Sequence, residues 1–277
     1  MISTQVTPAL FKPIKVGRLT LQHRVVLAPL TRMRAYASHV PGPQQASYYS
    51  QRGSAPGTLL ITEATLISHD AGGEAHVPGI YTDEQIKGWK KVRAPLSVIP
   101  NPFPSHGVLG LHQVTEAVHA KGSYIFLQLW ALGRAAEIDV LEKQDPPSPY
   151  VSASSILVTG RSKPPRPLTE DEIKDYIDTY AKAASNAVHG AGFDGVEIHG
   201  ANGFLPDQFL QTVSNTRTDG WGGDEQGRTR FTREIVDAVV AAVGQDRVGV
   251  RISPWSTFLG GVPALICTVL YSITCIF

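Results

Sequence analysis

The sequence of 277 residues is long enough for one barrel-sized domain, or for two smaller domains, with a substantial buried core. With 42% hydrophobic residues, 18% charged residues and a net charge of +1, the composition argues against a nucleic-acid binder, which usually carries a clustered basic face. Residues 1–19 lack the apolar core of a secretory signal, and the two cysteines, Cys267 and Cys275, can build neither a disulfide framework nor a cysteine-based zinc site. We therefore expect a cytoplasmic protein without a metal centre.

Short apolar segments recur along the chain and predict five buried strands. They lie at 24–29, 58–63, 123–130, 194–199 and 247–252. Continuous apolar segments of this length, alternating with helices, are typical of parallel strands that are covered on both faces.

Amphipathic segments between these strands predict helices at 43–51, from 82 through 89, behind 169–172 and over 226–243. Thr82–Gln85 and Thr169–Glu172 both have the spacing of a capping box. The helix behind the second box has an apolar stripe of Ile173, Ile177, Tyr180, Ala184 and Val188, and the last helix has one of Phe231, Ile235, Ala238 and Val239.

The alternation of strands and helices predicts an α/β fold of the (β/α)8 TIM-barrel type. Polar residues gather where the predicted strands end, at Thr31, Glu63, Gln128, His199, Asn202 and Arg251. In such a barrel the chemistry lies at that end of the strands. A doubly wound sheet also fits the periodicity, although no GxGxxG motif follows a predicted strand. Five of the eight strands of a closed barrel are predicted, so the barrel is expected to be incomplete.

Residues 93–113 interrupt what is otherwise one amphipathic helix, formed by 88–92 and 114–122 and ending at a glycine cap. The interruption contains four prolines, which a helix interior does not tolerate. We interpret it as an insertion or a retained intron, with a surface insertion as the alternative.

Residues 260–277 form an apolar tail without charge, where a polar-patterned helix is expected after the fifth strand. We interpret the tail as read-through at an unspliced junction and place residues 1–259 in the N-terminal part of a barrel. A tail anchor and a buried strand are the alternatives, although the tail is shorter than the ~20 residues that span a bilayer.

Six motifs follow one another in a fixed order. They are APLTRMR at 28–34, LITEA at 60–64, QLW at 128–130, HGANGFL at 199–205, SNTRTD at 214–219 with WGG at 221–223, and RISP at 251–254. Taken together, this set resembles the Old Yellow Enzyme family of flavin-dependent ene-reductases, over about residues 10–259 without 93–113. The resemblance implies FMN as cofactor, NADPH (or NADH) as hydride donor, and an α,β-unsaturated carbonyl compound as the small-molecule substrate.

The resemblance also implies which residues bind the flavin: Pro29, Leu30, Thr31, Ala64, Gln128 and Arg251. The Thr31 hydroxyl is expected near the C4 carbonyl, and the donors and acceptors of Gln128 suit the pyrimidine edge of the ring. Arg251, which is always charged, is expected to favour the anionic reduced flavin, unless it is only a surface cation at a strand end.

His199 and Asn202 form an H-x-x-N pair after the fourth predicted strand. Two N–H donors that converge on a carbonyl oxygen would stabilise the enolate formed when hydride reaches the β-carbon. Trp130 is expected to form a wall of the substrate pocket, or else to be a plain core aromatic.

Phe204 departs from the family pattern, in which a tyrosine at this position gives a proton to the α-carbon. A phenyl ring carries no exchangeable proton, so net alkene reduction would need another proton source. Hydride addition followed by its return, which isomerises the alkene, is therefore the alternative activity.

The missing strands are those whose loops hold the flavin phosphate in barrels of this type, so we expect little stable flavin binding by this chain. The remaining alternatives are a non-catalytic product that associates with other chains and a protein tethered to a membrane by its tail.

Overall fold

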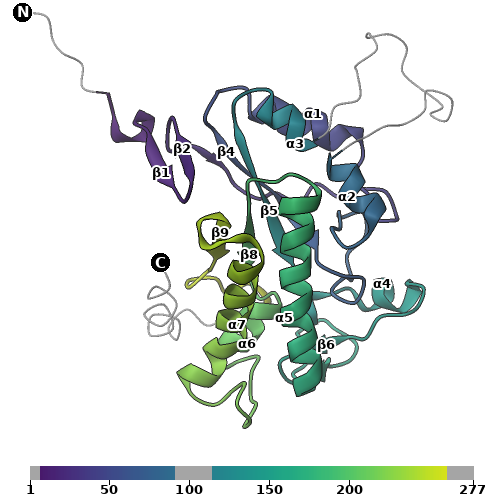
Figure 1. Cartoon of the computed structure of the whole chain (residues 1–277). Helices are drawn as coiled ribbons and strands as arrows, with labels where there is room; N and C mark the ends of the chain where they lie inside the picture. Colours follow the sequence, from purple (N-terminus) through teal and green to yellow (C-terminus); the bar gives the residue numbers. More distant parts are fainter. Residues whose placement is uncertain (1–6, 91–113, 261–277) are drawn as a thin grey trace, which may run out of the picture.

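The computed structural model describes residues 7–90 and 114–260. At its centre is a sheet of five parallel strands, shown in Figure 1. They are β3 (Val26–Leu27), β4 (Leu59–Leu66), β5 (Tyr124–Trp130), β8 (Gly195–His199) and β9 (Val248–Arg251). The strand order β3-β4-β5-β8-β9 follows the chain without reversal. A doubly wound sheet reverses its order at a switch point, so this order identifies an open barrel wall and confirms the predicted fold class.

Helices that pack in the main core connect these strands. They are α1 (Pro43–Arg52), α2 (Asp83–Lys90), α3 (Val114–His119), α5 (Glu170–Ser185) and α7 (Glu225–Val243). Short elements lie in the loops: α4 (Ile138–Lys143), α6 (Leu205–Leu210), and the pair β6 (Val151–Ser152) and β7 (Arg166–Pro167). One turn of π-helix, Asn186–Gly190, ends α5.

The two predicted capping boxes are present at the starts of α5 and α2. The Thr169 hydroxyl accepts from the Glu172 N–H at 3.2 Å, and the Glu172 carboxylate accepts from the Thr169 N–H at 2.8 Å. Thr82 and Gln85 exchange the same pair of bonds before α2. The predicted stripe of α5 is buried, and that of α7 is buried except for the half-buried Ala238.

The first strand differs from its prediction. A buried strand was expected over 24–29, but β3 spans two residues, and the side chains of Val25 and Val26 are 47% and 40% exposed. The prediction of burial is wrong because β3 lies at the edge of the sheet and pairs only with β4. An apolar run of six residues does not distinguish an edge strand from a central one.

An N-terminal hairpin covers one end of the sheet. Its strands are β1 (Ile14–Val16) and β2 (Leu19–Leu21), and its leucines pack against Leu59, Ile61 and Phe126 at the starts of β4 and β5. Arg18 at the turn pairs with Asp246 between α7 and β9 at 2.8 Å. The hairpin closes the amino-terminal end, so the carboxyl ends of the strands are left for a site.

The largest core cluster lies between the sheet and the helices. Trp89 of α2, Val114 and Val118 of α3, and Phe193 before β8 are all buried in it. The helix predicted from 88–92 and 114–122 is therefore present as two helices, α2 and α3, in one core, with Gly122 in the left-handed conformation after α3. The predicted insertion 93–113 lies outside the described residues, and so does the predicted tail 260–277 except for its first residue.

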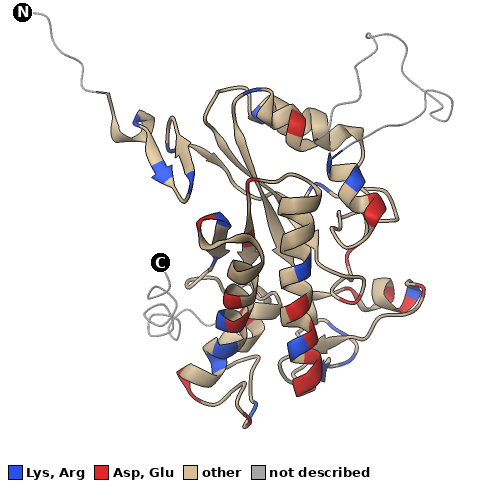
Figure 2. Cartoon of the chain, viewed as in Figure 1, with Lys and Arg blue, Asp and Glu red and all other residues tan. Residues whose placement is uncertain are grey.

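The charged side chains are of mixed sign. Figure 2 shows acidic and basic residues alternating along α5 and α7, whose polar faces point away from the core. Among the described residues, no helix is long and apolar enough to cross a membrane.

Candidate active site

A cavity of about 420 Å³ opens at the carboxyl ends of the five parallel strands. We call it the strand-end cavity. Its lining residues are Ala28, Pro29, Thr31, Ala64, Gln128, Trp130, His199, Asn202, Phe204, Arg251 and Phe258. The structure thus brings together every predicted site residue except Leu30, whose side chain is 50% exposed and does not line the cavity.

Strand register sets which side chains are neighbours. Ala64 in β4 is the partner of Gln128 in β5, because a shift of register after Ile61 moves β4 forward by one residue. Gln128 is in turn the partner of Glu197 in β8, and His199 is the partner of Arg251 in β9. Since residues two apart on a strand share a face, Glu197 and His199 both point to the cavity side of the sheet.

Glu197 is a site residue that the sequence analysis missed. Its Oε1 accepts from Gln128 Nε2 at 2.7 Å and from Arg251 Nε at 2.8 Å. Its Oε2 accepts from a second Arg251 nitrogen at 3.1 Å. One signal was available in the sequence: an acidic residue stands inside an apolar strand, two positions before His199.

His199 is a neutral imidazole. Burial, and to a smaller extent the nearby Arg251 guanidinium, lowers the pKa of His199 to about 3. The Nδ1 atom is buried and has no hydrogen-bond partner within the described chain. At neutral pH, His199 can therefore donate one N–H to a ligand but cannot act as a charged acid.

Asn202 is held by its backbone. It has a left-handed conformation with φ 58°, which asparagine tolerates better than most residues. Its N–H donates to Ser253 Oγ at 2.7 Å, and the next N–H, that of Gly203, donates to Asp207 Oδ2 at 2.8 Å. These bonds fix the turn between β8 and α6, so the position of the Asn202 side chain depends on the loop after β9.

An aromatic group forms one wall of the cavity. The ring of Phe204 meets Trp130 edge-on at 5.0 Å and His199 at 4.7 Å between ring centres. Trp130 also packs in a small core cluster, yet its indole N–H has no partner within the described chain. Both interpretations of Trp130 therefore hold: the ring is a core aromatic and its edge faces the site.

A buried carboxyl group supports the loop before the cavity. Glu63 Oε2 accepts from the Arg32 N–H at 3.1 Å, and Tyr49 donates its hydroxyl to Glu63 Oε1 at 3.5 Å. Burial raises the pKa of Glu63 to about 6, although both hydrogen bonds oppose this shift. Glu63 thereby holds the segment that carries Pro29 and Thr31, a role that the sequence did not predict.

Comparison with known proteins identifies the family of the chain. The profile of the NADH:flavin oxidoreductase / NADH oxidase family matches residues 9–95 and 99–263. The chain belongs to this family. It is 53% identical over 251 residues to a chanoclavine-I aldehyde reductase of Penicillium roqueforti, and 51% identical over 254 residues to a probable inactive reductase of Epichloe festucae var. lolii. These alignments cover 91% and 92% of this chain, and 62% and 60% of the relatives.

Solved structures of the family share the fold. The chain superposes on Old Yellow Enzyme from Pichia sp. with a TM-score of 0.83 at 37% identity, covering 96% of this chain and 66% of that one. It superposes on morphinone reductase with a TM-score of 0.82 at 38% identity, covering 98% and 69%. The family resemblance is thus confirmed, and the chain spans about three fifths of the length of its curated relatives.

Membership of the family implies FMN and a nicotinamide as cofactors, and the residues of the strand-end cavity fit a flavin ring. The cavity has apolar walls at Pro29, Ala64 and Trp130. Two buried polar atoms, His199 Nδ1 and Trp130 Nε1, lie beside them and have no hydrogen-bond partner among the described residues. Such atoms are costly in the free protein and indicate a polar ligand. Among the described residues, no group of three His, Cys, Asp or Glu could hold a metal ion.

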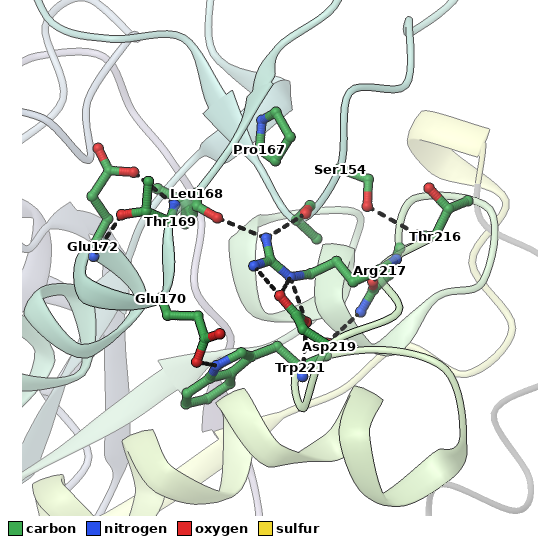
Figure 3. A network of polar contacts seen from close by, with 12 residues as sticks. Ser154, Pro167, Leu168, Thr169, Glu170, Glu172, Thr216, Arg217, Asp219 and Trp221 are labelled. Atoms are coloured by element: carbon green, nitrogen blue, oxygen red, sulfur yellow. Dashed lines mark hydrogen bonds and ion pairs between the residues drawn. The ribbon is translucent and has the colours of Figure 1, made fainter.

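The SNTRTD motif at 214–219 does not line the strand-end cavity and has a structural role. Arg217 of the SNTRTD motif donates to the carbonyl oxygens of Ala153 at 3.0 Å and Leu168 at 2.7 Å, and it forms an ion pair with Asp219 at 2.6 Å (Figure 3). The Trp221 N–H donates to the same carboxylate at 3.1 Å. We call these residues the Arg217 network; it ties the start of α5 to the loop before α7.

Proposed function

We propose that the protein is an FMN-dependent oxidoreductase that transfers hydride from NADPH or NADH, through the flavin, to the alkene of an α,β-unsaturated carbonyl compound. The observation that carries this proposal is the meeting of ring-binding and carbonyl-binding side chains in one cavity. The name of one relative, an aldehyde reductase, supports an aldehyde as the carbonyl compound.

The flavin supplies the hydride when it is bound; the protein holds and polarises the reactants. Gln128 and Arg251 offer a carboxamide and a guanidinium to the polar edge of the ring, and Thr31 offers a hydroxyl. Pro29 and Ala64 add apolar walls to the ring-binding set, whereas Leu30, the remaining predicted member, does not line the cavity.

His199 and Asn202 bind the carbonyl oxygen of the substrate. Because the pKa of His199 is lowered to about 3, its imidazole enters the reaction as a neutral N–H donor. Hydrogen bonds from both side chains strengthen as negative charge develops on the oxygen, and they therefore stabilise the enolate. The rings of Trp130 and Phe204 restrict the space beside the substrate carbonyl.

Phe204 favours a second outcome, isomerisation. It occupies the wall next to His199, and neither ring can release a proton at neutral pH. An enolate that is not protonated at the α-carbon can return the hydride after rotation about the former double bond. The product is then the isomeric alkene, with no net change in oxidation state.

The experiment loads the protein with FMN, supplies NADPH and an enal under anaerobic conditions, and identifies products by NMR. We expect slow reduction or isomerisation in the wild type and faster net reduction in Phe204→Tyr, by a factor of about 100 for a positioned acid. Equal product ratios in both proteins would show that another proton donor is in use. No consumption of substrate by either FMN-loaded protein would refute the proposed activity.

Flavin binding separates this proposal from a non-catalytic product. FMN fluorescence is titrated with the chain, with Gln128→Ala as the test variant and Gln226→Ala, on the exposed side of α7, as its matched control. We expect weak, saturable quenching that the first substitution reduces and the second does not. A chain that leaves FMN fluorescence unchanged would favour the non-catalytic alternative.

We further propose that the protein acts in the cytoplasm, and that 1–259 form the N-terminal part of its flavin barrel with an insertion or retained intron at 93–113 and a non-family tail at 260–277. The nearly cysteine-free sequence supports the location. Sequencing of the transcript tests the boundaries, because a processed transcript that keeps 93–113 would exclude a retained intron.

A further inference from the structure

Three strands contribute one charged or polar side chain each to a closed group at the base of the strand-end cavity. Glu197 of β8 stands between Gln128 of β5 and Arg251 of β9 and binds both. The Glu197 side chain is 10% exposed and that of Arg251 is 35% exposed, so the carboxylate is the inner member and the guanidinium reaches the cavity.

The contacts restrict the carboxamide of Gln128. One hydrogen of its Nε2 is used by Glu197 at 2.7 Å, which fixes the direction of the amide plane. The second N–H and the carbonyl oxygen of Gln128 are then left to the cavity that this residue lines. A carboxamide held in this way presents a donor and an acceptor side by side, without the entropy cost of ordering it on binding.

The same contacts balance the positive charge of the Arg251 guanidinium. Two Arg251 nitrogens are bound by the two oxygens of Glu197, which is the strong, planar arrangement of an arginine–carboxylate pair. A ligand in the cavity therefore meets a cation whose charge is largely balanced from behind. Removal of the carboxylate charge would leave the partly exposed cation without its balancing charge.

We propose that Glu197 is a positioning residue of the flavin site, which orients Gln128 and Arg251 toward the ring and balances the charge of Arg251. The inference rests on the proposed function, because it needs FMN in this cavity. It deepens the sequence prediction that Arg251 favours the anionic reduced flavin, because Glu197 sets the strength of that effect.

The experiment compares the wild type with Glu197→Gln and with Glu84→Gln, an exposed residue of α2 that serves as the matched control. Three quantities are measured: the Kd for FMN by fluorescence titration, the midpoint potential of bound FMN, and the melting temperature. We expect Glu197→Gln to bind oxidised FMN about tenfold more weakly, since a charge-assisted hydrogen bond is lost behind each ring contact. The potential should move in the positive direction, because an unbalanced Arg251 stabilises the negative charge of the reduced ring.

A double substitution tests whether Glu197 acts through Arg251. In an Arg251→Gln background, the substitution Glu197→Gln should no longer shift the potential. A purely structural carboxylate would lower the melting temperature and leave the potential unchanged. If Glu197→Gln does not fold, Glu197→Asp replaces it: the charge remains and the reach is shortened, so FMN binding should weaken at an unchanged potential.

The outcomes separate the two proposals. Wild-type affinity and potential in Glu197→Gln, or wild-type affinity in Glu197→Asp, would overturn the positioning role and leave the proposed function intact. A wild-type chain without saturable FMN binding would overturn the proposed function, and the positioning role with it.

Discussion

The strand-end cavity and the Arg217 network are both built from polar residues of the family motifs, but they differ in how completely those residues are paired. In the Arg217 network, one guanidinium is bound by two backbone carbonyls and a carboxylate. In the cavity, Trp130 and His199 each have a buried nitrogen that finds no partner in the part of the chain that the structure describes.

This difference separates scaffold from site. A paired buried cation stabilises the fold through the groups that it joins, and its removal leaves those groups unsatisfied. An unpaired buried donor destabilises the free protein, because it has lost its hydrogen bonds to water. A ligand that accepts a hydrogen bond from this donor offsets that cost. The motif sequence alone does not reveal which of the two roles a polar residue has.

The largest expected effect is a loss of stability when the Arg217 network is removed. Arg217→Ala should lower the free energy of unfolding by about 4 kcal/mol, because the side chain is 9% exposed and two carbonyls and Asp219 would lose their donor. Urea denaturation measures the change. A loss below about 1 kcal/mol would show that water replaces the guanidinium and that the network is not a scaffold.

The next effect concerns the site. His199→Ala in the FMN-loaded protein should lower kcat for the enal by about 100-fold, as expected for one donor to a developing oxyanion. The melting temperature should fall only by the amount expected for lost packing against Phe204, since the buried Nδ1 has no hydrogen-bond partner within the described chain. His189→Ala, at an exposed turn after α5, is the control. A large loss of stability with unchanged turnover would place His199 in the scaffold instead.

A smaller effect is dependent on pH. The pKa of Glu63 is raised to about 6 in the folded protein from 4.5, so the folded state binds the proton more tightly than the unfolded state does. Its contribution to stability is full below pH 4.5 and is lost as the pH rises through 6, by about 2 kcal/mol in all.

The substitution Glu63→Gln isolates this contribution. The unfolding free energy of the variant should gain about 2 kcal/mol relative to the wild type between pH 4.5 and 7, measured by urea denaturation at each pH. Glu116→Gln, an exposed residue of α3, should follow the wild type throughout. If the unfolding free energies of Glu63→Gln and the wild type change with pH in parallel, Glu63 is solvated in the folded protein.

The smallest expected effect is the loss of stability on removing an exposed arginine, Arg166, which can be compared with the loss for the buried Arg217. Arg166 also binds a carboxylate with two nitrogens, that of Glu172, but its side chain is 47% exposed. Arg166→Ala should therefore cost under about 1 kcal/mol, and less at high salt. A cost equal to that of Arg217→Ala would mean that burial does not distinguish the two ion pairs.

Much of this structure follows from local sequence. The two capping boxes, the stripes of α5 and α7 and four of the five parallel strands lie where the pattern predicts them. The polar residues at the strand ends could be predicted to lie together because a parallel sheet brings its carboxyl ends to one edge. The apolar members of the set, Pro29, Leu30 and Ala64, followed only from the family resemblance. The exposed β3 could not be predicted, because nothing in an apolar run marks the edge of a sheet.

The sequence by itself determined the main helices, four of the five parallel strands and the residue types of the site, because these depend on contacts a few residues apart and on motifs of adjacent residues. The order of the strands in the sheet was decided by the tertiary structure. Tertiary structure decided that Glu197 joins Gln128 to Arg251, that His199 is neutral, and that the Leu30 side chain lies outside the cavity. The reason is physical: register across neighbouring strands and loss of solvent are properties of residues that meet only when distant segments pack together.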